Sequence, residues 1–167
     1  EGKCIRFNEE DARAMGRQSI GVRGMKLKGT DVVVEMDVIK DPNIADLLVI
    51  MENGLGKMTK VQDYRFQARG GSGVKTANIT TKTGKIVGAK IIAKDTDADL
   101  IIMSKAGQVI RLHSKQIPSQ GRTTQGVYLM RMRPNDKVAS ISLIYTMEIP
   151  EGTAATEEEM EQESLEM

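Results

Sequence analysis

Aromatic side chains are scarce in this chain of 167 residues, which has three Tyr, two Phe and no Trp. Eleven methionines supply part of the missing bulk, and we expect them in the core because Met adapts to irregular gaps. The single cysteine, Cys4, excludes an internal disulfide and favours a reducing, cytoplasmic setting. The sequence holds no run of 18 apolar residues and no basic segment leading into an apolar core. It therefore predicts neither a membrane span nor a signal peptide.

Residues for catalysis are equally scarce. His113 is the only histidine, and no His, Cys or carboxylate residues have the spacing of metal ligands. Gly70-Gly71-Ser72-Gly73 is rich in glycine, but no Gly-Lys-Ser/Thr follows it, so a nucleotide-binding loop is not supported. The sequence predicts a binding module without a catalytic residue, metal or cofactor of its own.

The net charge of +1 conceals an asymmetry along the chain. The segment from Glu151 to Met167 has seven acidic residues and no basic one, which leaves 24 basic against 16 acidic residues in the body. A basic body with an acidic tail is typical of proteins that face nucleic acid. Two interpretations of the tail stay open: it competes with nucleic acid for the basic body, or it is a disordered, solvated end without a role.

One pattern occurs three times, in Gly16–Val22, Ala68–Val74 and Gly121–Val127. A small residue and an arginine are followed, four positions after the arginine, by Gly-Val. The arginines lie at positions 17, 69 and 122, a period of a little over 50 residues. A fixed period of this length predicts a repeat architecture.

Short apolar runs separated by glycine turns predict strands within each repeat. The second repeat has four expected strands, at Asp46–Met51, Gly56–Val61, Val74–Ile79 and Ile86–Ile92. The third repeat has the same order, at Asp99–Met103, Val109–Leu112, Val127–Met132 and Val138–Ile144. The first repeat lacks its first strand and has expected strands at Cys4–Phe7, Val22–Leu27 and Val32–Ile39. The chain is therefore expected to begin inside a repeat.

We expect an all-β fold, a propeller-like or pinwheel-like repeat of about three four-stranded blades. The expected boundaries are 1–45 for the incomplete first blade, 46–98 for the second, 99–149 for the third and 150–167 for the tail. Single turns of helix are expected in Glu9–Met15 and Lys115–Ile117. The missing first strand leaves an edge at which chains could associate with one another.

Repeated positive charges carry the expected binding chemistry. One row lies at the centre of an in-out-in strand triplet and consists of Arg6, Lys60 and Arg111. The second row is the arginine of the repeated motif, at Arg17, Arg69 and Arg122. Neighbouring loops add Arg13, Arg65, Lys75 and Lys115. Along a curved row of blades these cations would contact the phosphates of bent duplex DNA, with little reading of base sequence.

Two alternatives remain for these charges. Each motif arginine could hold its own loop in place by bonding backbone carbonyls, and the excess positive charge could be an ordinary solvated surface.

The residues also resemble a known family. Glu1–Phe7, Ala12–Arg17 and Gly21–Gly24, and later Val109–Leu112 with Gly121–Val127, are similar to the C-terminal domain of the DNA gyrase A protein. The resemblance covers residues 1 to 146. It implies a β-pinwheel, a propeller relative in which blades exchange strands and which wraps duplex DNA around a basic outer surface. This chain would be its last three blades with an acidic tail. It also implies a bacterial, nucleoid-associated protein. The gyrase B-type subunit, ATP and Mg²⁺ would act through parts of the enzyme outside this chain.

The family's characteristic loop, Gln-Arg-Arg-Gly-Gly-Lys-Gly, has an incomplete counterpart here. It consists of Gln67, Ala68, Arg69, Gly70, Gly71, Ser72 and Gly73. Ala68 and Ser72 remove two positive charges from the pattern. We interpret this loop as a degenerate copy, although in a complete short domain it would be the characteristic loop itself. Two rivals remain: the related domain of the topoisomerase IV A protein, and a propeller that binds an acidic protein.

Overall fold

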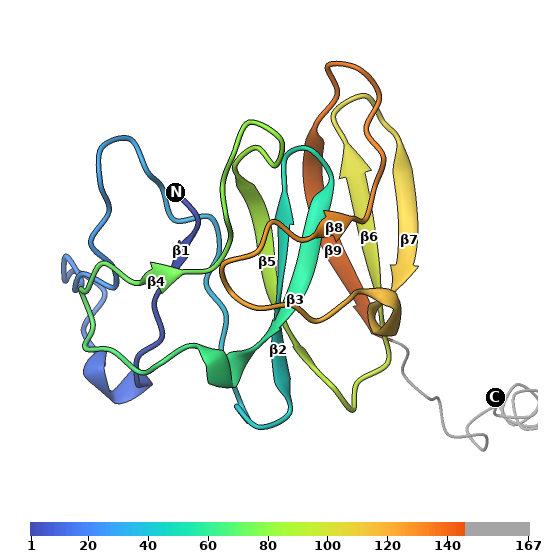
Figure 1. Ribbon diagram of the computed structural model, residues 1–167. Helices are drawn as coiled ribbons and strands as arrows, with labels where there is room; N and C mark the ends of the chain where they lie inside the picture. Colours follow the sequence, from blue (N-terminus) through green and yellow to red (C-terminus); the bar gives the residue numbers. More distant parts are fainter. Residues whose placement is uncertain (146–167) are drawn as a thin grey trace, which may run out of the picture.

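The computed structural model describes residues 1–145, and Figure 1 shows strands and loops arranged in successive units along the chain. The described residues form nine strands and three single turns of 3₁₀ helix. The strands are β1 (Lys3–Cys4), β2 (Ala45–Met51), β3 (Leu55–Lys60), β4 (Val74–Lys75), β5 (Ile86–Ala93), β6 (Ala98–Ser104), β7 (Val109–His113), β8 (Val127–Tyr128) and β9 (Val138–Tyr145). The short helices are η1 (Glu9–Asp11), η2 (Val61–Asp63) and η3 (Ser114–Gln116). The predicted all-β class is confirmed, whereas the predicted tail lies outside the described residues.

The central sheet has the order β5-β2-β3-β8 and is antiparallel throughout. Its first three strands come from the second repeat, but β8 comes from the third. The exchanged strand pairs Gly56 with Val127 and Leu55 with Tyr128. In Figure 1 the segment that carries β8 leaves its own unit and crosses to the edge of this sheet. The strand order alone, which gives each repeat four strands of its own, is therefore wrong for the third strand, whereas the strand exchange that the family resemblance implies is present.

The same exchange joins the first two repeats. β4, from the second repeat, pairs with β1 of the first, with Val74 opposite Cys4 and Lys75 opposite Lys3. A backbone hydrogen bond is repeated at equivalent positions. The amide of Thr76 donates to the carbonyl of Gly2, and the amide of Leu129 donates to the carbonyl of Gly54. Each repeat is thus tied to the one before it by its third strand.

Turn glycines give the repeats a common register. Gly2, Gly54 and Gly107 all have positive φ, between 69° and 82°, and each lies just before the second strand of its repeat. Glycine is required at Gly54, because a Cβ there would lie 2.1 Å from the carbonyl oxygen of Met130. Positions in different repeats are compared below by their distance from these glycines.

Apolar residues of β2 alternate between two cores. Leu48 and Ile50 join a cluster with residues of the third repeat, including Leu100 and Ile102. Leu47, Val49 and Met51 pack on the other face, with Tyr64 and with partly buried residues that include Cys4 of the first repeat. A strand buried on both faces is expected for a blade enclosed by two neighbours.

The first repeat differs most from the predicted strands. Val22–Leu27 and Val32–Ile39 are not strands in the structure, and Val32, Val33, Met36 and Val38 are each more than 60% exposed. In the later repeats the fourth strand pairs with the first, as β5 with β2 and β9 with β6. Among the described residues no strand pairs with the segment 32–39 in this way. The segments starting at Val74 and Val127 are strands for two residues only.

Candidate nucleic-acid interface

The motif arginines of the second and third repeats contact the preceding repeat. Arg122 donates from Nη1 to the carbonyl oxygen of Lys75 at 3.1 Å. Arg69 donates from Nη1 to the carbonyl oxygen of Arg23 at 2.8 Å, and from Nε to that of Asp11 at 3.0 Å. Arg23 and Lys75 are equivalent, since each comes two residues after the glycine of the Gly-Val motif. We call this repeated contact the arginine clasp.

Backbone hydrogen bonds reinforce each clasp at equivalent positions. The amide of Lys26 donates to the carbonyl of Gly71 at 2.9 Å, and one repeat later that of Asn78 donates to Thr124 at 3.1 Å. Gly70 adds a bond to the carbonyl of Gly24 at 2.8 Å. The motif loop of each repeat therefore lies against the third-strand segment of the repeat before it. This arrangement places the motif loops in a row along the successive repeats. The exposed side chains of Arg23 and Lys75 lie at equivalent positions in this row.

Arg17 differs from its two counterparts. Its side chain is exposed, and among residues 1–145 its guanidinium forms no hydrogen bond or ion pair. The predicted alternative, that a motif arginine bonds backbone carbonyls, thus describes Arg69 and Arg122 but not Arg17. Within residues 1–145, all five N–H donors of Arg17 are left for a ligand such as a phosphate.

The predicted row of Arg6, Lys60 and Arg111 is wrong in one member, because Lys60 does not occupy the position in its repeat that Arg6 and Arg111 occupy in theirs. Arg6 and Arg111 come four residues after their turn glycines, but the equivalent residue of the second repeat is Met58. The backbone agrees, because Gln67 donates to the carbonyl of Arg6 as Gln120 donates to that of Met58. Lys60 lies two residues further along. A shift of two keeps a side chain on the same face of a strand, so alternation alone could not reveal it.

The guanidinium of Arg6 makes contacts within the fold. Its Nη1 donates to the carbonyl oxygens of Val61 and Tyr64, both at 3.2 Å, and its guanidinium lies 4.0 Å from the centre of the Phe66 ring. These contacts fix the η2 loop of the second repeat against the first. Arg6 therefore has a structural role similar to that of the clasps.

Acidic residues accompany the cations of the third repeat. Asp99 receives a hydrogen bond from Arg111 Nε at 2.6 Å and contacts His113 Nδ1 at 3.2 Å. Asp97 lies 3.0 Å from His113 Nε2 and 3.6 Å from the Lys115 ammonium. The hydrogen bond from Arg111, with a smaller contribution from His113, holds the pKa of Asp99 below its usual value. Two predicted DNA contacts, Arg111 and Lys115, are thus paired with carboxylates.

The remaining predicted cations are exposed. Arg13, Lys60 and Arg65 lie at the surface of the loops or strand ends that carry them. Lys75 is exposed too, and its ammonium donates to Asn78 Oδ1 at 2.8 Å. Arg23 belongs with this set although it was not predicted. The signal that identifies it is the basic residue directly after Gly-Val in both Gly21-Val22-Arg23 and Gly73-Val74-Lys75.

The incomplete counterpart of the family's characteristic loop, Gln67–Gly73, forms the loop of the Arg69 clasp. Gly70 and Gly73 have φ of +81° and +71°, and a Cβ on Gly73 would lie 2.7 Å from the carbonyl oxygen of Cys4. Its glycines thus serve the close approach of two repeats. Ala68 and Ser72 are exposed at the positions where the family's loop has cations.

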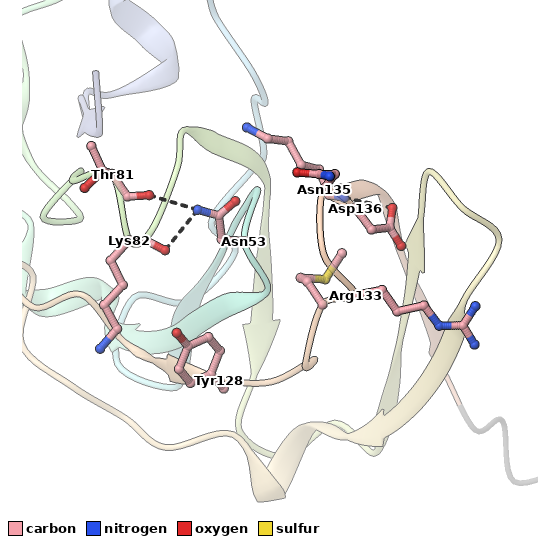
Figure 2. Close-up of a pocket in the computed structure, with 9 residues that line it drawn as sticks. Asn53, Thr81, Lys82, Tyr128, Arg133, Asn135 and Asp136 are labelled. Carbon is pink, nitrogen blue, oxygen red and sulfur yellow. Dashed lines mark hydrogen bonds between the residues drawn. The ribbon is translucent and has the colours of Figure 1, made fainter.

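An open pocket of about 560 Å³ lies near the turns at residues 80–84 and 132–137. Figure 2 shows residues that line it. Asn53 closes one side by donating to the carbonyls of Thr81 and Lys82, each at 3.0 Å. The Lys82 ammonium lies 5.6 Å from the centre of the Tyr128 ring, and the side chain of Arg133 extends away from both. These residues add cationic and aromatic surface that the sequence did not single out.

Metal ligands and membrane spans are absent from residues 1–145. These residues contain no cluster of three or more His, Cys, Asp or Glu side chains arranged to hold a metal ion. None of their helices is long and apolar enough to cross a membrane.

The fold defines a class of radial β-repeat proteins, in which a strand of each unit completes the sheet of the unit before it. A family model described as the DNA gyrase C-terminal domain, β-propeller, matches residues 1–40, 45–93 and 98–144. The chain belongs to this family.

Relatives and solved structures agree with this assignment. Curated DNA gyrase A proteins of Staphylococcus aureus strains MRSA252 and NCTC 8325 / PS 47 are 41% identical over 140 residues. The match covers 84% of this chain and 16% of each relative, so the chain spans about a sixth of the length of these proteins. A solved DNA gyrase A C-terminal domain matches with a TM-score of 0.74 and 30% identity, over 86% of this chain and 47% of that one.

A solved C-terminal domain of DNA topoisomerase IV matches with a TM-score of 0.78 at 21% identity. That match covers 86% of this chain and 44% of the other. At this identity the likeness concerns the fold alone.

Proposed function

We propose that this chain binds duplex DNA through its phosphates and bends it along the row of repeats. The observation that supports the proposal most strongly is the repeated clasp, in which Arg69 and Arg122 each hold their motif loop against the preceding repeat. The clasps leave the side chains of Arg23 and Lys75 exposed at equivalent positions. Arg17 lies at the equivalent position in the motif loop of the first repeat, and its guanidinium has no hydrogen-bond partner among the described residues. Evenly repeated cations suit the regular phosphates of a duplex and give no means of reading bases.

Bending needs several such contacts. Bending a site of 20–30 base pairs by 40–90° costs on the order of 1–6 kcal/mol. Contacts distributed over consecutive repeats offset that cost better than one strong site, because each forms only if the duplex follows the row. Exposed cations of this kind are Arg13, Arg17, Arg23, Lys60, Arg65 and Lys75.

The wider role follows from the family. We propose that the chain is part of the A protein of a gyrase-type topoisomerase in the bacterial cytoplasm, where bound DNA is presented for negative supercoiling. The gyrase B-type subunit, ATP and Mg²⁺ would act through other parts of that enzyme. The 41% identity to gyrase A proteins supports gyrase over topoisomerase IV, to whose domain the likeness is one of fold.

Salt dependence of binding tests the proposal. Fluorescence anisotropy would measure the dissociation constant of the chain for two duplexes of unrelated sequence between about 50 and about 200 mM salt. We expect similar constants for both, and a slope of log K against log salt of about −0.9 per neutralised phosphate. Arg17→Ala and Lys75→Ala should each make the slope shallower by about 0.9 if they contact one phosphate each.

Three outcomes would contradict the proposal. The first is no binding to either duplex at low salt, with capture of the chain by polyglutamate, which would favour the protein-binding alternative. The second is a preference for one of the two sequences. The third is an equal change of slope for Lys105→Ala, a control in the exposed β6–β7 turn outside the proposed contacts.

A further inference from the structure

A lysine is buried beneath one of the motif loops. Lys57, in β3, has no exposed surface. Its ammonium donates to the carbonyl oxygens of Gly121 at 2.7 Å and Arg122 at 2.8 Å, and to Thr124 Oγ1 at 3.1 Å. These three bonds use all three donors of the ammonium. Among the described residues no carboxylate pairs with it, so this loop alone satisfies the buried charge.

Packing does not require a lysine at this position. The residue three places after the turn glycine is Ile5 in the first repeat and Ile110 in the third, and both are partly buried. A buried cation is unfavourable unless it is fully hydrogen-bonded, so a lysine here needs a purpose other than filling space. Its three acceptors all belong to the segment that carries Arg122.

The loop above Lys57 is held from two further directions. Thr59, next on the same face of β3, donates from Oγ1 to the carbonyl of Gln120 at 2.9 Å. The clasp of Arg122 holds the loop against Lys75. Lys57 is the only one of these three anchors that brings a positive charge beneath the loop.

We propose that Lys57 is a positioning residue that fixes the Gln120–Gln125 loop, so that the Arg122 clasp of this loop holds the backbone of Lys75, one of the proposed DNA contacts. The DNA part of this inference rests on the proposed function, whereas the anchoring of the loop does not. The buried lysine acts on the ligand only through the loop that it anchors.

The unmodified protein allows a direct test. Burial, with a smaller contribution from the charge of Arg122, lowers the pKa of Lys57 from 10.5 to about 8. Arg122 is the charged group that faces Lys57, and the buried Tyr64 ring lies 5.8 Å from the Arg122 guanidinium. A titration by NMR with labelled lysine should show one lysine with a midpoint near 8. The amide signals of Gly121, Arg122 and Thr124 should move with the same midpoint. Loop amides that do not respond at this midpoint would overturn the proposal.

Substitution gives a second test with a matched control. Lys57→Met keeps the volume and removes the charge, and Lys105→Met removes one charge from an exposed turn. We expect Lys57→Met alone to accelerate hydrogen exchange in the loop and to raise the duplex dissociation constant roughly tenfold. Equal behaviour of the two variants in both measurements would overturn the proposal.

A milder change covers the case in which Lys57→Met does not fold. Thr124→Val removes one of the three acceptors from an exposed position and should accelerate exchange at Gly121 and Arg122. Unchanged exchange in this variant would count against anchoring. If the unmodified chain binds no duplex, the proposed function fails, while the titration and exchange measurements still decide whether Lys57 anchors the loop.

Discussion

The guanidinium of Arg122 bonds the carbonyl oxygen of Lys75, and one repeat earlier Arg69 bonds the carbonyl oxygen of Arg23 in the same way. The arginine of each pair belongs to one repeat and the carbonyl to the repeat before it. The sequence predicted these arginines as phosphate contacts. In the structure their hydrogen bonds connect one repeat to the repeat before it. Arg17, which has no such partner among the described residues, remains the motif arginine most available to a ligand.

Stability should separate these roles. Arg69→Ala and Arg122→Ala should each lower the free energy of unfolding by about 1 kcal/mol, because each removes hydrogen bonds between repeats. Arg17→Ala should change it by less than about 0.5 kcal/mol, as expected for an exposed side chain. Urea denaturation followed by circular dichroism measures all three. An equal loss of unfolding free energy in all three variants would contradict the different structural roles of Arg17 and the two clasp arginines.

Glycine substitutions test the strand exchange. Gly54 and Gly107 have almost the same φ, +81° and +82°. A Cβ on Gly54 would lie 2.1 Å from the carbonyl oxygen of Met130, whereas one on Gly107 would meet nothing within 4 Å. Gly107→Ala should therefore cost only the backbone strain of about 1–2 kcal/mol. Gly54→Ala should cost clearly more, since it also separates the exchanged segment from β3. Similar melting temperatures for the two variants would contradict this contact.

The acidic partners of the third repeat should weaken DNA binding there. Asp99→Asn removes the carboxylate that pairs with Arg111 and should lower the duplex dissociation constant several-fold at low salt. Asp95→Asn is the matched control, because it removes one negative charge from the same region, where its carboxylate accepts from the Thr96 hydroxyl. Filter binding at low salt compares the two. The idea fails if the control tightens binding as much as Asp99→Asn does.

Stability should depend on pH through Lys57. Its pKa is about 8 in the folded chain and 10.5 without burial, so between these values the unfolded chain binds more protons. Stability should therefore rise with pH across this window as far as Lys57 contributes. Burial raises the pKa values of Cys4 and Tyr64, which act in the opposite direction, so comparison with Lys57→Met isolates the lysine.

Urea denaturation of the protein and of Lys57→Met at several pH values measures this effect. The protein should gain stability relative to the variant as the pH rises from about 8 to 10.5. A difference between the two that stays constant over this range would contradict the buried ammonium.

The sequence predicts much of the fold because its signals are local. Glycine turns and apolar runs located the strands of the second and third repeats, including β2, β5, β6 and β9. The strand pattern alone could not predict the pairing of β8 with β3, since a strand that follows its own repeat in sequence gives no sign that it completes another. Only the family resemblance implied an exchange of strands. Segment 32–39 was misjudged for a related reason: its apolar residues form a strand only beside a first strand.

The DNA-binding site remains a prediction, and the structure shows how its residues lie. Repeated arginines and the basic body indicated phosphate contacts, and the side chains of Arg17 and Lys75 are exposed, as that role requires. The clasps were open as an alternative, but which arginines form them depends on contacts between repeats. Lys57 was not singled out, because nothing in the sequence distinguishes a buried lysine from the exposed Lys60 three residues later.

Bending of the duplex is the most direct test of the central claim. A short duplex labelled at both ends with a fluorescence donor and acceptor would be titrated with the chain at low salt. The account predicts that energy transfer between the ends rises as the chain binds, for unrelated sequences alike. It should fall back as salt releases the phosphate contacts. Binding that saturates with no rise in energy transfer would contradict it.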